Sequence, residues 1–382
     1  MWEVALKMLI GDRAKYFALI FGIAFATLLM SQQVSIFISL MARTANQVLD
    51  VREADLWVMD PRVRYVDEVE PLADSALSQV RSVAGVEWAV PLYKGLAILR
   101  TGEGVINQIS LVGVDDETLV GAPREWLAGG PGLLREPDTI VLDKEGAGLI
   151  WPGEDPLSKV GFVAEINDRR VRVAGIVDAS PPFITFPIAY VKYSDALRLT
   201  PPARRKLSFV LVRAKPGIAP KDLANSISAQ TGLQALTWDQ FGWRSVLYYL
   251  TRTGIPVNFG ITVMLGFLVG AAITAQTFYL FVIENLRQFG ALKAIGATNT
   301  QIAGMVMLQS AVVGALGYAL GIGACALFFT LVGENAAALE GFYLRWQVIA
   351  GSALVVGLIV LVSVIGSLQK VFRIDPAIVF RG

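Results

Sequence analysis

Three charged side chains, Glu284, Arg287 and Lys293, lie in a short segment between two long uncharged stretches. Residues 253–283 precede the segment without a charge, and residues 294–333 follow it without one. Acidic and basic side chains on one short helix can make charge-assisted hydrogen bonds to a protein partner. The spacing therefore indicates a docking element for a soluble partner; a plain hairpin between two apolar helices is the alternative.

Residues that usually carry catalysis are scarce. The chain has no His, and its one Cys, Cys325, lies inside an apolar run, which excludes His-based catalysis, Cys/His zinc sites and an intrachain disulfide. Asp115 and Asp116 are interpreted as the turn that ends a strand. No G-x-x-x-x-G-K-[ST] motif occurs, so the chain does not bind ATP through a P-loop. We expect no catalytic residue, metal or cofactor in this chain.

The elements that must position the charged segment are apolar runs of membrane length. The chain is 54% hydrophobic and 17% charged, with a mean hydropathy of +0.55, whereas soluble domains carry roughly a quarter charged residues. A spanning helix needs about 20 mainly apolar residues. Four runs meet this length: 16–41, 254–283, 303–333 and 346–369. The net charge of +1 gives no indication of nucleic-acid binding.

The charges of the short loops predict the orientation, because loops rich in Lys and Arg stay in the cytoplasm. Such charges occur in three segments: residues 1–15, 284–302 and 370–382. The short loop 334–345 carries two acids against one Arg and is expected outside. The chain is therefore predicted to be a multi-pass membrane protein with cytoplasmic N- and C-termini, and with residues 42–253 as one large external domain.

Two further helices are predicted beside the spans. Residues 1–15 are expected to form an amphipathic cytoplasmic helix on the inner membrane surface, with a simple extension of the first span as the alternative. Residues 239–252 are expected to form a helix that approaches the membrane, with Trp243, Tyr248 and Tyr249 in an interfacial aromatic belt. If that helix were continuous with the second span, it would form a rigid stalk that transmits movement.

The external domain is predicted to be α/β. Residues with strand-like alternation lie at 54–60, 86–100, 107–115, 206–214 and 233–238. Residues with helical spacing lie at 71–83 and 219–232. Between them, residues from about 121 to 195 are rich in Gly and Pro, and "VGFVAEI" and "RRVRVAGIV" are typical of a β-hairpin. This part is predicted to be a β-rich insertion in a discontinuous domain.

The charged segment itself is predicted to fold as helix, tight turn and helix. The first helix is expected from about Val282 to Ile295, with an apolar stripe formed by Leu286, Phe289, Leu292 and Ile295. Gly296 is well placed for a left-handed helix cap. Thr298 and Gln301 match a capping box that starts the next helix.

The stretch "ENLRQFGALKAIGATNTQI" resembles the E-x-x-R-E-[IF]-G-x-[LM]-[KR]-A-[IL]-G-A-[ST]-x-x-x-I segment of the MacB/FtsX-like ABC transporter permease family. Seven residues fall on this pattern in register: Glu284, Arg287, Gly290, Lys293, Ala294, Gly296 and Ala297. Gln288 stands where the family more often has Glu. "RIDPAIVFRG" (373–382) resembles the family's C-terminal motif, and "GIAFATLLMSQQVSIF" (22–37) resembles the first span of its DevC-type branch.

The resemblance implies a membrane α-helical fold with four transmembrane helices, and an α/β extracytoplasmic (periplasmic) domain inserted between helices 1 and 2. It implies the permease subunit of an ATP-driven exporter in the bacterial inner membrane, working as a dimer with a second permease copy. The seven residues would bind a separate cytoplasmic ABC ATPase, which holds ATP and Mg. Motion would reach the periplasmic domain and serve export of a hydrophobic or amphipathic substrate, together with a periplasmic adaptor (a membrane fusion protein) and an outer-membrane channel.

Two other functions of the resembled family remain open: an FtsX-like regulator of envelope enzymes and a lipoprotein-releasing permease. The identity of the substrate does not follow from the sequence. Besides membrane lipid, the expected contacts include helix packing at two small-xxx-small pairs, Gly266 with Gly270 and Gly317 with Gly321. These glycines predict close helix contacts either in a dimer or within one chain.

Overall fold

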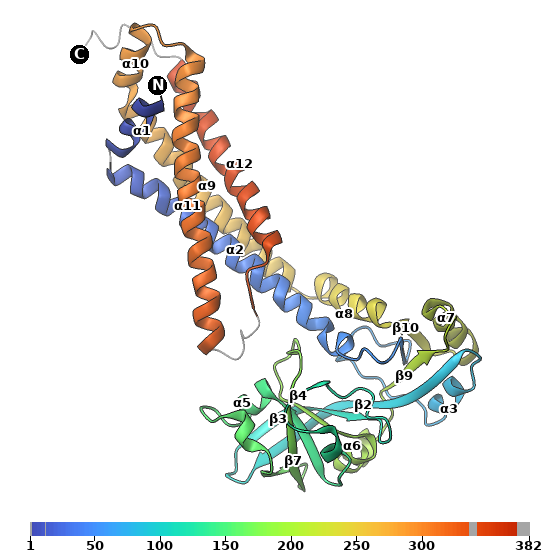
Figure 1. Cartoon of the computed structure of the whole chain (residues 1–382). Helices are drawn as coiled ribbons and strands as arrows, with labels where there is room; N and C mark the ends of the chain where they lie inside the picture. The colour runs from blue at the N-terminus through green and yellow to red at the C-terminus, as the bar shows by residue number, and fades with distance from the viewer. Residues whose placement is uncertain (1, 12, 336–341, 373–382) are drawn as a thin grey trace. The chain divides into compact units, whose positions relative to one another are not determined.

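A computed structural model describes residues 2–11, 13–335 and 342–372 (Figure 1). The C-terminal motif at 373–382 and part of the loop 334–345 lie outside the described residues. The chain divides into a helical unit, Met1–Ser39 with Gly254–Gly382, and an α/β unit, Leu40–Thr253. Helix α2 (Arg13–Leu49) begins in the helical unit, and its last turns belong to the α/β unit.

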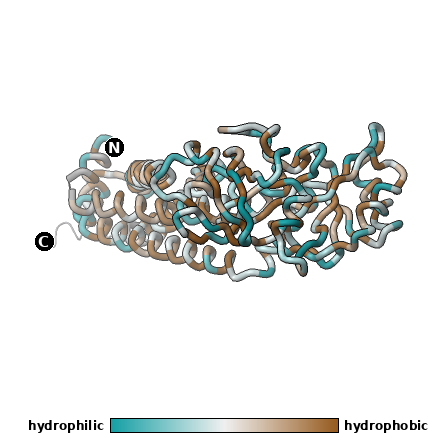
Figure 2. The backbone as a smooth tube through the Cα atoms, turned by 90° about the horizontal axis from the view of Figure 1, so that it is seen from below, coloured by the Kyte–Doolittle hydropathy of each residue, from teal (hydrophilic) through white to brown (hydrophobic). Residues whose placement is uncertain are grey.

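The helical unit is built from four long helices. Besides α2 these are α9 (Ile255–Glu284), α11 (Asn299–Asn335) and α12 (Trp346–Phe372). Each contains a stretch long and apolar enough to cross a membrane, and Figure 2 shows these helices largely in the hydrophobic colour. Two shorter helices, α1 (Trp2–Gly11) and α10 (Leu286–Ala294), complete the unit. The prediction of four spans, with an α/β domain between the first and the second, is confirmed.

Glycines bring α9 and α11 close to α2. A Cβ atom built at Gly270 of α9 would lie 2.3 Å from the Cβ of Ala26, and one at Gly321 of α11 would lie 2.5 Å from the carbonyl oxygen of Ala24. The other two glycines of the small-xxx-small pairs also contact α2: Gly266 and Gly317. All four glycines therefore pack helices together within one chain.

The first half of the α/β unit is an antiparallel sheet with the strand order β10–β1–β9–β2. Its strands are β1 (Leu56–Met59), β2 (Val86–Thr101), β9 (Phe209–Ala214) and β10 (Gln234–Thr237). Helix α3 (Ala76–Arg81) connects β1 to β2, and α7 (Pro220–Thr231) connects β9 to β10. The result is a split βαβ arrangement of the ferredoxin-like kind.

Helix α3 is shorter than the helix predicted over residues 71–83. The backbone N–H of Leu72 donates a hydrogen bond to the carbonyl oxygen of Leu207 at 2.9 Å, and the two residues form an isolated bridge. The start of the expected helix is therefore extended, because its backbone pairs with a distant segment of the chain.

Side chains of this sheet alternate between its two faces, as the strand period of two requires. Leu56 and Val58 of β1 join the core under α3 and α7. Trp57 lies in the core on the other face, where its ring is 5.4 Å from Phe209 and 5.6 Å from Phe241 of helix α8 (Trp238–Arg252). Both faces of the sheet are therefore buried.

Strand β2 also belongs to the second half of the unit. Its residues 86–92 pair with β9, and its residues 93–100 pair with β3 (Ile106–Val114). The sheet continues in the order β3–β8–β5–β7–β4, with β4 (Glu125–Gly129), β5 (Thr139–Asp143), β7 (Arg169–Asp178) and β8 (Ile188–Lys192). Strand β6 (Val163–Ile166) pairs with β7 in the predicted hairpin.

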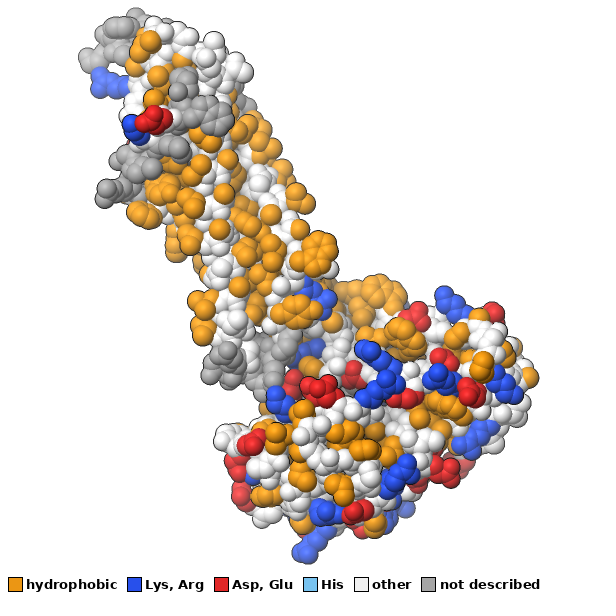
Figure 3. All heavy atoms as spheres, in the orientation of Figure 1, with side chains coloured by type: hydrophobic (Ala, Val, Ile, Leu, Met, Phe, Trp, Pro, Cys, Tyr) orange, Lys and Arg blue, Asp and Glu red, His pale blue; other side chains and the backbone are white. Residues whose placement is uncertain are grey.

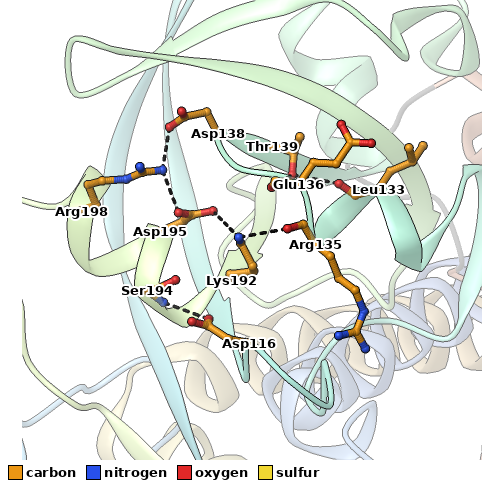
Figure 4. A network of polar contacts seen from close by, with 10 residues as sticks. All are labelled: Asp116, Leu133, Arg135, Glu136, Asp138, Thr139, Lys192, Ser194, Asp195 and Arg198. Carbon is orange, nitrogen blue, oxygen red and sulfur yellow. Dashed lines mark hydrogen bonds and ion pairs between the residues drawn. The ribbon is translucent and has the colours of Figure 1, made fainter.

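Short helices α4 (Pro131–Leu134), α5 (Lys144–Ile150) and α6 (Tyr193–Leu199) connect these strands. A polar network ties α6 to its surroundings (Figure 4). Nη2 of Arg198 lies 2.7 Å from Oδ1 of Asp138 and 2.7 Å from Oδ1 of Asp195. Nζ of Lys192 lies 3.6 Å from Oδ2 of Asp195 and donates a hydrogen bond to the carbonyl oxygen of Arg135 at 3.1 Å.

The two aspartates directly after β3, Asp115 and Asp116, accept hydrogen bonds from nearby backbone and hydroxyl groups. Oδ2 of Asp115 accepts hydrogen bonds from the backbone N–H of Thr118 at 2.9 Å and from its hydroxyl at 2.7 Å. Oδ1 of Asp116 accepts one from the backbone N–H of Ser194 at 3.1 Å. The two carboxylates thus shape a turn after a strand, as predicted.

Helix α8 is not continuous with α9. It ends at Arg252, Thr253 is extended (φ −118°, ψ 160°), and α9 begins at Ile255 with Pro256 in its first turn. Proline has no N–H to continue the helical hydrogen bonds of α8. The condition for a rigid stalk through α8 is therefore not met, and the helix that runs unbroken between the two units is α2.

The predicted aromatic belt of residues 239–252 is wrong for Tyr249. The ring of Tyr249 is buried and lies 4.3 Å from Phe183, and the ring of Tyr248 stacks on Tyr65 at 4.3 Å. Tyr249 is therefore a core residue of the α/β unit, whereas Tyr248 is half-buried at its surface. Trp243 is exposed, with 62% of its surface accessible.

A valine at Gly270 is expected to destabilise the helical unit, because its side chain would overlap Ala26 on α2. Overpacking of this kind costs about 1–3 kcal/mol. The control is Gly260→Val on the same helix, where no heavy atom of the described residues lies within 4 Å of the added Cβ. Thermal unfolding of both variants in detergent checks the prediction, and equal melting temperatures would contradict it.

A pH dependence is expected from Asp143, which is buried at the start of α5. Its carboxylate accepts backbone N–H bonds from Gly146 at 2.8 Å and Ile188 at 2.6 Å, yet burial raises its pKa to about 6. Between about pH 4 and 6 the folded chain keeps this proton while the unfolded chain loses it. The free energy of unfolding should therefore fall by up to about 3 kcal/mol as the pH rises through this window.

Asp143→Asn should flatten this decline, because the amide does not titrate. Urea unfolding of the nanodisc-embedded chain at several pH values between 4 and 7 measures the slope. An identical slope for the variant and the unaltered chain would show that Asp143 does not cause it.

Candidate coupling site

The charged segment joins three helices. Helix α9 ends at Glu284, because Asn285 leaves the helical conformation (φ −90°, ψ 8°) before α10 starts. The Nδ2 of Asn285 donates a hydrogen bond to the carbonyl oxygen of Phe281 at 2.8 Å. The single helix predicted from Val282 to Ile295 is therefore two helices, separated by a residue that caps the first with its own side chain.

The end of α10 is the predicted turn. Gly296 has φ 103°, a conformation that glycine adopts far more readily than other residues. The N–H of Ala297 donates to the carbonyl oxygen of Leu292 at 2.9 Å, which closes a Schellman-type cap. The N–H of Thr298 donates to Oε1 of Gln301 at 2.9 Å, and the N–H of Gln301 donates to Oγ1 of Thr298 at 3.3 Å. The predicted positive-φ glycine and capping box are both confirmed.

Phe289 anchors α10 to the helical unit. Its side chain is fully buried in an apolar cluster drawn from five other helices, α1, α2, α9, α11 and α12. The cluster includes Leu9 of α1, Leu19 and Ile20 of α2, Phe281 and Val282 of α9, and Ile302 and Val306 of α11. Helix α1 is held there as well, since Nε2 of Gln309 donates to the carbonyl oxygen of Ala5 at 2.6 Å. This cluster, the coupling floor, fixes the turn to the first span.

The structure divides the predicted coupling residues by their exposure. Six of the seven are exposed or half-buried: Glu284, Arg287, Lys293, Ala294, Gly296 and Ala297. Gly290 is buried beside Phe289, on the side of α10 that packs against the helical unit. Ile295, predicted to continue the buried stripe, is 85% exposed, and that expectation is wrong. Its position as the last residue before a helix-ending glycine is the sequence signal that points to this exposure.

The exposed face of the turn therefore offers a guanidinium group at Arg287 and an apolar side chain at Ile295. The buried side chain of Phe289 fixes the backbone that carries them. This combination suits binding to a groove of another protein. Within residues 2–11, 13–335 and 342–372, no group of three His, Cys, Asp or Glu side chains is placed to hold a metal ion.

The far end of α2 is held by polar contacts inside the α/β unit. Nδ2 of Asn46 donates a hydrogen bond to the carbonyl oxygen of Pro181 at 2.9 Å. The carboxylate of Asp50 accepts hydrogen bonds from the hydroxyl of Ser180 at 2.8 Å and from its N–H at 3.1 Å. Burial raises the pKa of Asp50, partly offset by the bonds from Ser180.

A buried lysine adds a third contact to this end of α2. Lys94 of β2 is 9% exposed, and its Nζ lies 2.5 Å from Oδ1 of Asp67. The same ammonium group donates hydrogen bonds to the side chain of Gln47 on α2 and to the carbonyl oxygen of Val66, the latter at 3.2 Å. Burial lowers the pKa of Lys94, against the opposing effect of Asp67. The spacing of these residues in the sequence gave no sign of the contact.

Two family models match the chain. One, described as the MacB-like periplasmic core domain, matches residues 16–230, and the other, described as the FtsX-like permease C-terminal region, matches residues 260–376. An uncharacterised ABC transporter permease of Mycobacterium tuberculosis is 26% identical over 317 residues, which cover 82% of this chain and 80% of the relative. A similar permease of Mycobacterium bovis is 26% identical over 323 residues, with the same coverage.

Two solved structures align with about half of the chain at low similarity. The periplasmic region of MacB from Actinobacillus actinomycetemcomitans aligns with a TM-score of 0.38 and 15% identity, over 50% of this chain and 92% of that structure. The extracellular domain of the ABC-type transporter YknZ from Gram-positive bacteria aligns with a TM-score of 0.35 and 15% identity, over 48% and 98% respectively.

Lys94→Met is expected to loosen the α/β unit. The substitution leaves Asp67 and Gln47 without their cationic partner, and breaking a buried pair costs about 3–5 kcal/mol, less where the remaining charge reaches water. Thermal unfolding in nanodiscs measures the loss. The matched control is Lys206→Met, which removes an exposed lysine of the same unit. A melting temperature as high as that of the control would show that the buried contact is not stabilising.

Proposed function

The chain belongs to the permease family that combines a MacB-like periplasmic core domain with an FtsX-like C-terminal region, and we propose that it is the transmembrane subunit of an ATP-driven exporter. Its relatives are ABC transporter permeases. In this proposal a separate cytoplasmic ATPase holds ATP and Mg and docks on the turn between α10 and α11. This chain contributes binding and movement, and the hydrolysis takes place on its partner.

The observation that carries the proposal is the exposed turn on a rigid base. Arg287 and the 85% exposed Ile295 project from a backbone that is fixed by Phe289, by the turn at Gly296 and by the capping box. An exposed isoleucine flanked by charges is typical of an apolar anchor with a polar rim in a protein interface. Arg287, Glu284 and Lys293 would make the charge-assisted contacts around it.

The coupling floor supports a route for the movement. Phe289 shares its apolar cluster with Leu19 and Ile20 of α2, so a push on α10 would reach α2 through this cluster. Helix α2 has 37 residues without a break, and at about 1.5 Å per residue it is roughly 55 Å long. We propose that it carries the movement to the contacts at Asn46, Gln47 and Asp50.

The remaining partners are part of the same proposal. The chain would sit in the bacterial inner membrane with both termini in the cytoplasm, next to a second copy of itself. The α/β unit would lie in the periplasm and meet an adaptor and an outer-membrane channel, through which a hydrophobic or amphipathic substrate leaves. The four spans and the MacB-like match of residues 16–230 support this arrangement.

Arg287→Glu and Ile295→Asp are each expected to reduce co-purification of the ATPase by about tenfold or more, because tenfold in affinity corresponds to about 1.4 kcal/mol. Membrane insertion should be unchanged, since both side chains are exposed. The measurement is the amount of ATPase recovered, and its ATP hydrolysis, with the nanodisc-embedded chain from its native cells.

The matched control is Lys7→Glu, which reverses a charge on α1, where Lys7 pairs with Glu3 on the surface at 2.8 Å. It should leave ATPase recovery unchanged. Full recovery with Arg287→Glu and Ile295→Asp would remove the turn from the proposed interface. An adaptor in the same preparation would support export, whereas an envelope hydrolase in its place would contradict it.

A further inference from the structure

Helix α8 has an apolar face that no other described part of its unit covers. Phe241, Ser245 and Tyr249 form its buried side, spaced four residues apart. On the opposite side Trp243 is 62% exposed and Leu247 is 45% exposed. Figure 3 shows hydrophobic side chains gathered over this helix. Large apolar side chains on two sides of one helix, with only one side buried, indicate a second apolar environment.

The chain places the last residue of α8 near the lipid boundary. Two residues separate Arg252, the last of α8, from Ile255, the first of α9. Three Cα–Cα steps of 3.8 Å span at most about 11 Å. Helix α9 is apolar enough to cross a membrane, and its side chains are exposed from the first turns, with Val257 at 64% and Ile261 at 55%. The end of α8 therefore lies within about one helix diameter of a lipid-facing surface.

We propose that α8 is a membrane-surface helix, whose Trp243–Leu247 face lies at the headgroup boundary of the bilayer. Tryptophan is enriched at that depth, because its ring is apolar and its N–H can meet the headgroups. Arg252 is an exposed cation at the end of the helix next to the span, which complements anionic headgroups. The short connection from α8 to α9 favours the bilayer over a protein partner as the surface that covers this face. The proposal does not depend on the coupling of an ATPase.

The break between α8 and α9 agrees with this role. A helix that continued α9 would leave the membrane along the axis of the span, whereas the extended Thr253 allows α8 to turn away from that axis.

The test uses the full chain in vesicles of phosphatidylcholine and phosphatidylglycerol. The native thiol is removed by Cys325→Ala, and a single cysteine is introduced by Trp243→Cys or, as the control, by Ile98→Cys. Ile98 is 53% exposed on the second half of the same unit, so the two labels begin with similar exposure. Each cysteine carries an environment-sensitive fluorophore, and half of the vesicles contain lipids with brominated acyl chains.

The expected result is strong quenching of the label at position 243 by brominated lipid, and little quenching at position 98. Both substitutions replace exposed side chains, and circular dichroism confirms folding. Equal quenching at the two positions would overturn the proposal. A label at position 243 that is shielded from water but not quenched would also overturn it, because a protein would then cover the face.

Discussion

The close approach of α9 and α11 to α2 is the constraint on which the helical unit depends. The Cβ of Ala26 leaves no room for a side chain at Gly270, and the carbonyl oxygen of Ala24 leaves none at Gly321, so these helices pack very closely. In lipid there is little hydrophobic force between apolar helices, and van der Waals contact of this kind holds them together. Helix α2 is packed against α9 and α11 in this way, so it cannot tilt without them. The first buried residues of α2 also belong to the coupling floor around Phe289.

The two ends of α2 are held by different physics. At one end apolar side chains interlock with α1, α9, α10 and α11, and at the other end amide and carboxylate groups bind to backbone and to a buried lysine. Apolar packing resists displacement in every direction, whereas hydrogen bonds are directional and break over short distances. In the proposed coupling, the polar end is therefore the one at which a movement of the helix would first change specific hydrogen bonds.

The features that could be predicted from the sequence are those that a local rule dictates. Spans follow from the thickness of the bilayer, and the turn at Gly296 and the box of Thr298 and Gln301 follow from the hydrogen-bonding needs of helix ends. The break at Thr253 was also signalled locally, by Gly254 and Pro256 just after it. The break at Asn285 was not, because asparagine is tolerated inside helices and its capping bond to Phe281 is seen only in the structure.

Features made by distant parts of the chain could not be predicted in this way. The pairing of Leu72 with Leu207 shortened a helix whose local pattern was sound. The ammonium group of Lys94 draws its partners from residues 47, 66 and 67, and no spacing rule connects them. Ile295 fits the apolar stripe by count, but it is the C-cap of α10 and its side chain is 85% exposed, which the periodic rule does not reveal.

One detail of strand β2 gives the unit a mechanical property. The strand exchanges its pairing partner between Leu92, which pairs with β9, and Tyr93, which pairs with β3. Lys94, the next residue, is the one that α2 grips through Gln47. If α2 carries movement as we propose, its load would be applied at the junction of two half-sheets, close to both of them. Such a load would shear the halves against each other and change the angle between them, while leaving each half internally rigid.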